Sequence, residues 1–303
     1  MKRKILSALL LILIGGGLMA AGYWMGGKPR AFAIGPIFGF KNEGRPLHSR
    51  KSLPAASIDQ TVLTDDSTRI KRLFVDISSA SLEIVPHDED GFTYAITNNT
   101  DKVNAAVQIK HDALYITTKK HKAFSKWFHI DLGGGNTHRT AITVNIPAHF
   151  IFETVDITSG VGEIVLDGFQ AQRSFALTTG IAESEVKNIT ASNVHIQTGV
   201  GQAEFRNCTF TDTVMQTGVG EVLFEGNILK KFDIDSGVGS ADLRINGKKD
   251  DYRLDIDSGI GEVLVDGAHI GSFGGSVRAA GSNAEHHIRI QSGIGEVRLR
   301  FKS

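Results

Sequence analysis

Cysteine and proline are scarce in this chain, and each scarcity limits what the chain can be. Cys208 is the only cysteine among the 303 residues, so no internal disulfide can form. No proline follows Pro147, which suits a long hydrogen-bonded ladder because proline lacks the amide donor that the ladder needs. Cys208 has no histidine nearby in the sequence to activate it, so we interpret it as a small thiol of the core.

Net charge and catalytic motifs are also missing. The 33 basic side chains balance 33 acidic ones, which gives no support for bulk binding of nucleic acid. The glycine-rich segments lack the third glycine and the following helix of a dinucleotide-binding loop, and His286 and His287 lack the spacing of a helical metal site. We therefore expect a protein that is not an enzyme and holds no cofactor.

A short box that occurs seven times in the second half of the chain is the strongest signal present. Each box reads Ser or Thr, Gly, Val or Ile, then Gly or Ala, between apolar segments, and the first glycines are Gly160, Gly180, Gly199, Gly218, Gly237, Gly259 and Gly293. The steps between these glycines are 20, 19, 19, 19, 22 and 34 residues. A period near 19 indicates a repeat array whose units bury a core only by stacking.

Three columns of apolar residues align across the repeats. The first is Ile157, Leu177, Ile196, Met215, Ile234, Ile256 and Ile290; the second is Val161, Ile181, Val200, Val219, Val238, Ile260 and Ile294; the third is Leu166, Val186, Phe205, Phe224, Leu243, Val265 and Leu299. Alternation along each strand predicts that all three point inward, with a corner at the last glycine of each box. Parallel rungs stacked about 4.8 Å apart would build such columns.

Other β architectures fit this pattern less well. Propeller blades need roughly 40 residues, and the calcium-binding roll has a period of about 9. An antiparallel sandwich would use hairpin turns instead of one repeated box. We therefore predict an all-β, parallel β-solenoid with rungs of about 19 residues.

The N-terminus carries a second signal. Lys2, Arg3 and Lys4 precede an apolar stretch over residues 5–24, and 20 helical residues span about 30 Å, the thickness of a bilayer core. We predict a transmembrane anchor within residues 1–25, with the repeats outside the cytoplasm. A cleaved signal peptide is the alternative.

The remaining sequence divides into three parts. Residues 26–68 hold four of the six prolines and read as a linker or stalk. Residues 69–150 are predicted to form a β-rich cap with degenerate first rungs, in which Leu73–Ser79 imitates the start of a repeat, residues 107–110 and 114–117 flank a turn at His111, and Ala141–Pro147 form a strand. Residues 151–303 form the repeat domain, with an excursion expected at Ala268–Glu285.

Four aspartates stand out as a candidate site. Asp233, Asp235, Asp255 and Asp257 are expected to face outward on neighbouring rungs, where close carboxylates require a cation, a proton or nearby basic side chains. Neighbouring lysines make a structural role one interpretation, calcium binding by oxygen ligands a second, and acid/base chemistry on a saccharide a third.

Two other charged segments also have a structural and a functional interpretation to consider. Glu225 is expected between two arginines of adjacent rungs, as a cross-strand pair that keeps the face soluble. Lys119–His129 mixes basic and aromatic residues, which is compatible with contact to anionic wall polymer or lipid headgroups and with a solvated loop.

Taken together, the N-terminal span, the segment Ile142–Pro147 and boxes such as Thr217–Gly220 resemble the bacterial adhesin-like family of β-strand-repeat proteins of unknown function. The resemblance covers roughly residues 70 to 303. It implies a right-handed parallel β-solenoid on the outer side of a bacterial membrane, and some members resemble accessory proteins of cell-envelope stress signalling. It supplies no catalytic residues.

These observations lead to one functional expectation and one alternative. We expect a membrane-anchored, extracytoplasmic interaction or scaffold protein whose partners are cell-wall polymer or envelope proteins. The alternative is a calcium-binding or polysaccharide-acting β-helix protein that uses Asp233, Asp235, Asp255 and Asp257.

Overall fold

The computed structural model describes residues 61–64, 69–97, 104–118, 140–272 and 275–302, which all belong to one structural unit, Ala56–Ser303. The predicted membrane anchor, most of the predicted linker and the segment Lys119–His129 lie outside the described residues. Among the described residues, no helix has the length and apolar character needed to cross a bilayer.

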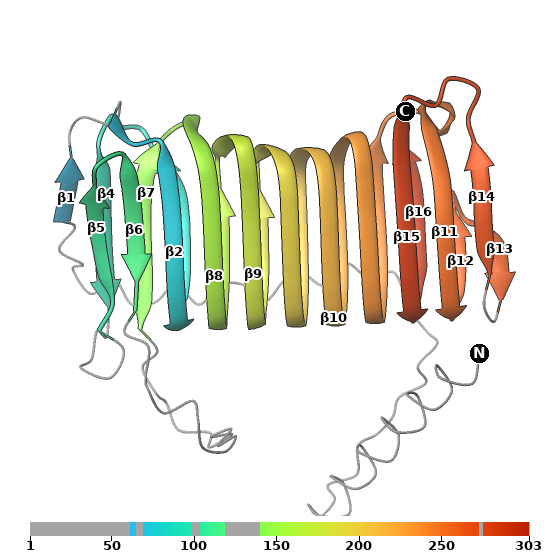
Figure 1. The fold of residues 1–303 in the computed structure, drawn as a ribbon, viewed down its shortest axis with the longest axis horizontal. Helices are drawn as coiled ribbons and strands as arrows, with labels where there is room; N and C mark the ends of the chain where they lie inside the picture. Colours follow the sequence, from blue (N-terminus) through green and yellow to red (C-terminus); the bar gives the residue numbers. More distant parts are fainter. Residues whose placement is uncertain (1–60, 65–68, 98–103, 119–139, 273–274, 303) are drawn as a thin grey trace, which may run out of the picture. The chain divides into compact units, whose positions relative to one another are not determined.

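The described residues fold almost entirely into β-strands (Figure 1). The N-terminal part contains β1 (Thr61–Thr64), β2 (Arg72–Ser79), β3 (Ser81–His87), β4 (Phe92–Thr97), β5 (Ala106–Lys110), β6 (Ala113–Thr117) and β7 (Ala141–Pro147). The repeat part contains β8 (Phe150–Asp167), β9 (Phe169–Lys187), β10 (Thr190–Asn246), the short 3-10 helix η2 (Lys249–Asp251), β11 (Tyr252–Ile260), β12 (Glu262–Val265), β13 (Ala268–Ser272), β14 (Ser276–Ala280), β15 (His286–Ile294) and β16 (Val297–Lys302). The all-β prediction is confirmed.

Successive repeats pair in parallel and in register. Ile157 of β8 lies opposite Leu177 of β9, which lies opposite Ile196 of β10. Leu166 likewise lies opposite Val186 after the box. Each repeat therefore forms one rung: the residues before the box build a first face, the residues after it build a second face, and the core lies between them. This arrangement is solenoid-like, as the period predicts.

The last repeat of the sequence is not the last rung of the stack. β15 pairs in parallel with β10 on one side and with β11 on the other (Figure 1), and β16 lies in the same way between β10 and β12. The expectation that the Asp233 and Asp255 segments occupy neighbouring rungs is therefore wrong. Rungs of the same register present the same backbone pattern, so a slot between two rungs accepts a later segment of the chain.

Antiparallel strands close both faces at this end of the stack. β14 pairs with β11 on the first face, and β13 pairs with β12 on the second. The predicted excursion at Ala268–Glu285 therefore contains two strands that cover the outermost rung. They occupy backbone groups that an open parallel edge would leave unpaired.

The N-terminal end is built by the same principle. β2 and β3 pair directly with β8, whereas β6 and β7, which follow them in the sequence, lie on their outer side. Antiparallel β5 and β4 then close the two faces, and β1 pairs with β4 although the sequence places it in the linker. The predictions that Leu73–Ser79 forms a rung and that His111 lies in a turn, with φ 58°, are confirmed.

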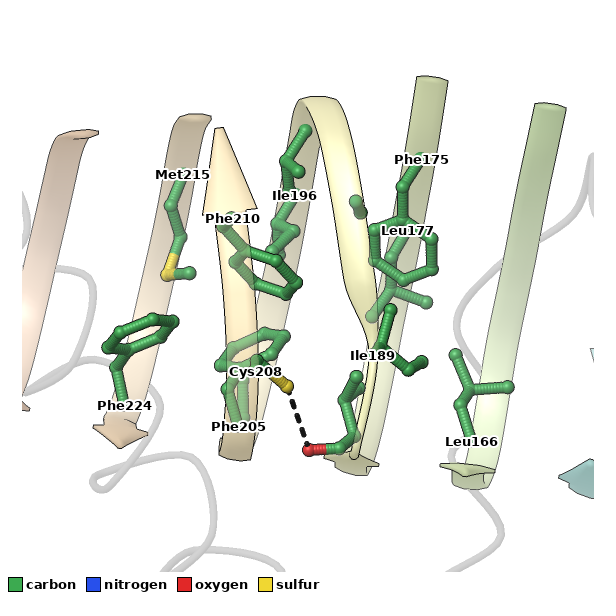
Figure 2. Close-up of a cluster of buried hydrophobic side chains, with 14 of the residues drawn as sticks. Leu166, Phe175, Leu177, Ile189, Ile196, Phe205, Cys208, Phe210, Met215 and Phe224 are labelled. Atoms are coloured by element: carbon green, nitrogen blue, oxygen red, sulfur yellow. Dashed lines mark hydrogen bonds between the residues drawn. The ribbon is translucent and has the colours of Figure 1, made fainter. Parts of the chain in front are cut away.

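The first and third columns form the core between the faces. Their members, such as Ile234 and Phe224, are at most 1% exposed. Phenylalanines form a chain of ring contacts through this core, and Figure 2 shows part of it around Phe205, Phe210 and Phe224. Cys208 lies fully buried beside them, and this burial raises the pKa of its thiol to about 12. Its interpretation as a core residue is confirmed.

The second column does not point inward, and this prediction is wrong. In the first repeat the inward alternation ends at Ser159, which is buried, and resumes at Ile164. The chain turns the corner over the four residues between them instead of at Gly162 alone, so Val161 stands on the outer side of the bend and is 42% exposed.

Candidate interaction surface

The second column forms a continuous line of exposed aliphatic side chains along one corner of the stack. We call it the apolar ridge: in stack order it consists of Val161, Ile181, Val200, Val219, Val238, Ile294 and Ile260, which are 42–57% exposed. Among the described residues, 11 large hydrophobic side chains are exposed, and the ridge accounts for seven of them. Exposed apolar side chains are thus concentrated on this corner, which is typical of a contact surface.

Glycine backbones hold the ridge in this position. A Cβ on Gly199 would lie 2.4 Å from the carbonyl oxygen of Gly180, and one on Gly293 would lie 2.4 Å from that of Gly237. No side chain fits where the rungs approach so closely. The first glycines of the boxes therefore form one lane without side chains, and the glycines and Ala182 at the last box position form a second lane on the other side of the ridge. We call these two rows the glycine lanes.

The last glycine of the box also needs an unusual backbone conformation in most repeats. Gly220 has φ 150° and Gly239 has φ 145°, values that residues with a Cβ rarely adopt. This agrees with the predicted corner. Ala182 takes the same place in the second box and is absent from the positive-φ residues of the described chain, which explains why alanine is tolerated there.

A row of polar residues accompanies the ridge on each side. The first flank, on the first face, consists of Thr158, Thr178, Gln197, Gln216, Asp235, Gln291 and Asp257; the second flank, on the second face, consists of Glu163, Glu183, Gln202, Glu221, Ser240, Glu296 and Glu262. The second flank holds five glutamates, whereas five of the seven first-flank residues are neutral. The ridge is therefore bordered by an acidic side and a mostly neutral side.

The four candidate aspartates do not form the cluster that the sequence suggests. Arg289 of β15 lies in register between Asp233 of β10 and Asp255 of β11. On the outer side of β11, Arg278 lies 3.4 Å from Asp255 and 3.8 Å from Asp257, and Lys231 pairs with Asp233 at 2.6 Å.

Asp233, Asp255 and Asp257 thus each have a basic side chain within 4 Å. Within the described part of the chain, no group of three or more His, Cys, Asp or Glu residues is arranged to hold a metal ion. Metal binding by Asp233, Asp235, Asp255 and Asp257 stays a prediction, and a structural role agrees better with the ion pairs of Asp233, Asp255 and Asp257.

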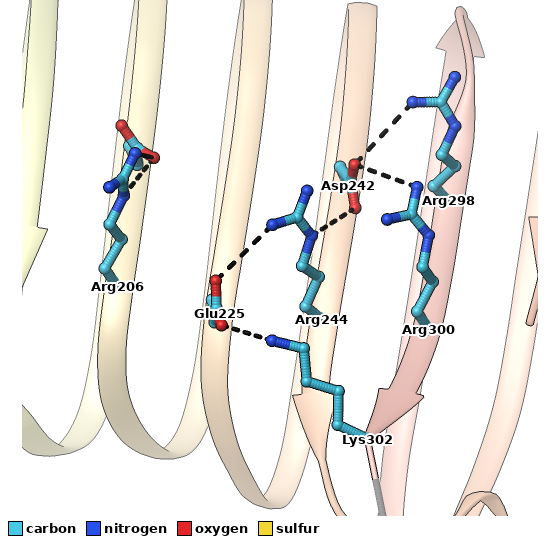
Figure 3. A network of polar contacts seen from close by, with 8 residues as sticks. Arg206, Glu225, Asp242, Arg244, Arg298, Arg300 and Lys302 are labelled. Atoms are coloured by element: carbon cyan, nitrogen blue, oxygen red, sulfur yellow. Dashed lines mark hydrogen bonds and ion pairs between the residues drawn. The ribbon is translucent and has the colours of Figure 1, made fainter. Parts of the chain in front are cut away.

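The second face carries a network of ion pairs near β16 (Figure 3). Glu225 contacts Lys302 at 2.5 Å and Arg244 at 3.8 Å, and the hydrogen bond from Lys302 is the main reason that the pKa of Glu225 is lowered. Asp242 lies within 4 Å of Arg298 and Arg300. The expectation that Glu225 lies between two arginines of adjacent rungs is confirmed, since the charges of Arg244 and Arg206 both lower its pKa. Only Arg244 forms an ion pair with it, because Arg206 pairs with Glu204.

Two shallow hollows accompany these charged regions. One, of about 370 Å³, is lined by Arg253, Asp255, Arg278 and His287 among others. The second, of about 440 Å³, lies beside Lys248, Lys249 and Phe301. Neither is lined by a serine, threonine or cysteine, which are common nucleophiles of covalent catalysis.

Sequence reasoning found the ridge residues but assigned them to the core. The signal that could have corrected this is the pair of glycines around each Val or Ile. An apolar residue between two glycines lies on a bend, where the alternation of side chains is interrupted.

The chain is similar to a family of sequences and to several solved structures. The sequence profile of the family described as Toastrack DUF4097 matches residues 70–302. Among solved structures, a candidate cell adhesion protein from Clostridium sporogenes is 15% identical, with 81% of this chain and 100% of that chain covered and a TM-score of 0.33. A candidate adhesin from Bacteroides fragilis is 10% identical, with 82% and 99% covered and a TM-score of 0.31. A search of curated proteins gave no match.

Proposed function

Because the chain belongs to the Toastrack DUF4097 family, a domain family of unknown function, we propose from its own geometry that it is a non-enzymatic, adhesin-like interaction protein. The observation that carries the proposal is the apolar ridge: seven aliphatic side chains about half exposed, in one line and in register. An exposed apolar surface of this kind favours aggregation unless a partner covers it, so such surfaces usually mark interaction sites. The core and the glycine lanes hold the ridge rigid, which suits recognition.

We also propose that this interaction takes place outside the cytoplasm, at a membrane to which residues 5–24 anchor the chain. The proposal is supported by the basic residues Lys2–Lys4 before a 20-residue apolar stretch. Mass spectrometry of the membrane fraction should find the intact N-terminal segment. A mature chain that begins near Ala21 or Gly22 would identify a secreted protein and contradict the anchor.

Cells that produce the full-length chain provide the test of the ridge. We compare wild type, Val219→Asp on the ridge and Leu229→Asp, an exposed aliphatic residue outside the ridge (40% exposed). The readout is the number of neighbouring cells, or of envelope fragments from cells that lack the chain, that stay attached to the producing cells after washing. The ridge variant should lose this contact and the control should keep it. Equal attachment by all three, or turnover of a polysaccharide by the purified wild type, would contradict the proposal.

A further inference from the structure

We propose that the apolar ridge binds the ridge of a second copy of this chain, with the two copies parallel and related by a twofold axis along the stack. The inference rests on the proposed function, because it names the partner of the same surface. Three features carry it: the rigidity of the ridge, the open lanes beside it, and the distribution of charge on its two flanks.

The ridge is prepared for contact with a copy of itself. All seven side chains are Val or Ile, whose branched Cβ restricts χ1, so little conformational entropy is lost when they are buried. Six rung steps of about 4.8 Å give the ridge a length of roughly 29 Å. The glycine lanes leave room beside the ridge, so the ridge of one copy can lie against the lane of the other.

The two flanks are complementary when the copies are parallel. A twofold axis along the ridge places the first flank of one copy opposite the second flank of the other, at the same rung. Acidic residues then meet neutral partners in pairs: Glu163 with Thr158, Glu183 with Thr178, Glu221 with Gln216, Glu296 with Gln291, and Asp235 with Ser240. At the third rung Gln202 meets Gln197. Carboxylates that face hydroxyl and amide groups can accept hydrogen bonds instead of repelling each other.

The opposite orientation lacks this complementarity. If the copies were antiparallel, the second flank of each would face the second flank of the other. Glu183 would then lie opposite Glu296, Glu163 opposite Glu262, and Glu221 opposite its own counterpart. Like charges placed opposite one another disfavour an interface, so the sequence selects the parallel arrangement.

One rung does not pair an acidic flank residue with a neutral one, and its two acidic residues have partners within their own chain. At the outermost rung both flank residues, Glu262 and Asp257, are acidic. Each already has a basic partner within its own chain: Glu262 contacts His269, and Asp257 lies 3.8 Å from Arg278. The single like-charged pair of the parallel arrangement is therefore the one whose members are both paired locally.

The size of the surface suits a dimer that includes the flanks. Seven half-exposed aliphatic side chains offer roughly 500 Å² of apolar surface, near the upper end of patches on monomeric proteins. A specific interface buries about 800 Å² on each partner. The ridge would therefore form the apolar centre and the flanks the polar rim of a standard interface.

Single cysteine variants of the full-length chain test both the contact and its orientation. Ile181→Cys, Val219→Cys and Ile294→Cys sit at the second, fourth and sixth positions of the ridge. Cells that produce each variant are treated with an oxidant before lysis, and disulfide-linked dimers are measured on a non-reducing gel. Cys208 stays in all variants because its thiol is buried. Leu229→Cys, outside the ridge, reports random collisions.

The parallel arrangement predicts dimers from all three ridge variants and few from the control. Dimers from Val219→Cys alone would show an antiparallel pair and overturn the inference, because only the central residue would then meet itself. The absence of dimers from every ridge variant would overturn it as well, and would leave another protein, a polymer or a lipid surface as the occupant. In that case the proposed function would still hold if Val219→Asp lost the attachment of neighbouring cells or envelope fragments.

Charge substitutions on the flanks distinguish the specific contact from non-specific association. Thr178→Glu places a carboxylate opposite Glu183 of the second copy and should reduce cross-linking through Val219→Cys severalfold. Adding Glu183→Lys should restore it, since unlike charges then face each other. If neither substitution changes the yield of cross-linked dimer, the predicted pairing of the flanks is contradicted.

Discussion

Gly239 lies directly on Gly220 in the stack: a Cβ added to Gly239 would stand 1.6 Å from the carbonyl oxygen of Gly220. Two rungs can approach so closely only if neither carries a side chain there. Repetition of this contact lets the boxes stack in register and leaves Val or Ile outside. The glycine lanes are therefore a condition for the ridge.

The first prediction concerns this contact. Gly239→Ala should destabilise the protein by about 3 kcal/mol or more, because it adds a steric clash to an unfavourable φ of 145°. The reverse change at the equivalent position, Ala182→Gly, should cost only about 0.5–1 kcal/mol. Denaturant unfolding of both variants measures the difference, and equal stabilities would mean that the rungs do not meet as described.

The second prediction separates the core from the ridge. Ile234 is 1% exposed, so Ile234→Asp buries an unpaired carboxylate and should unfold the array locally or completely. Val219 is 50% exposed, so Val219→Asp should change the unfolding free energy of the monomer by only about 0.5 kcal/mol. Circular dichroism at low protein concentration checks this. If both variants melted alike, the outward direction of the ridge would be refuted.

The third prediction concerns the four aspartates. Added calcium should leave the melting temperature of the wild type unchanged, because Arg289 separates Asp233 from Asp255 and Arg278 pairs with Asp255. Changing Asp233, Asp235, Asp255 and Asp257 to Asn should affect stability only slightly. A rise of several degrees with calcium in the wild type, lost in the fourfold variant, would instead establish a metal site through preferential binding to the folded state.

The fourth prediction uses the raised pKa of Cys208, about 12. The native thiol should not react with a disulfide reagent at pH 8, because the thiolate is the reactive form and the site is buried. Its reaction should follow global unfolding in denaturant. The raised pKa also favours the folded state below the ordinary thiol value of 9.0, and this advantage should fade as the pH rises toward 12. Rapid labelling of the native protein would contradict the burial.

The fifth prediction concerns Glu225, whose pKa is lowered mainly by its hydrogen bond with Lys302. A lowered carboxyl pKa stabilises the folded state above the ordinary value of 4.5, and this contribution disappears as the pH falls through the lowered pKa. Glu225→Gln should thus be slightly less stable than wild type at pH 7 and equally stable near pH 2. The effect is small because the pair is partly exposed. A stability difference that persists in strong acid would point to packing instead.

Much of the fold could be predicted from the sequence because its physical causes are local. Alternation identified the buried columns that contain Ile234 and Phe224, and the residue pattern of Leu73–Ser79 revealed a rung without glycines. The direction of Val161 could not be predicted by alternation, because the bend around its two glycines interrupts the period of two.

The order of the rungs has no local signal at all. The boxes at Gly259 and Gly293 are identical, and either would pair with the rung of Gly237 in the same register. Only long-range packing decides that β15 takes the inner place, and this determines the environment of the candidate aspartates. Arg289 therefore could not be predicted as the neighbour of both Asp233 and Asp255.

The inner position of β15 and β16 means that the outermost rungs in space are not the outermost segments in the chain. A repeat protein that stacks in sequence order can unravel from its tips, one unit at a time. Here, release of residues 286–302 would open a gap between β10 and the outer strands β11 and β12. Release of β2 and β3 would likewise open a gap between β8 and the outer strands β6 and β7. A pulling force from the C-terminal side must therefore break the array from within. From the N-terminal side, β1 is released first because it lies at the outer edge against β4, and only then is β2 drawn out from between β6 and β8.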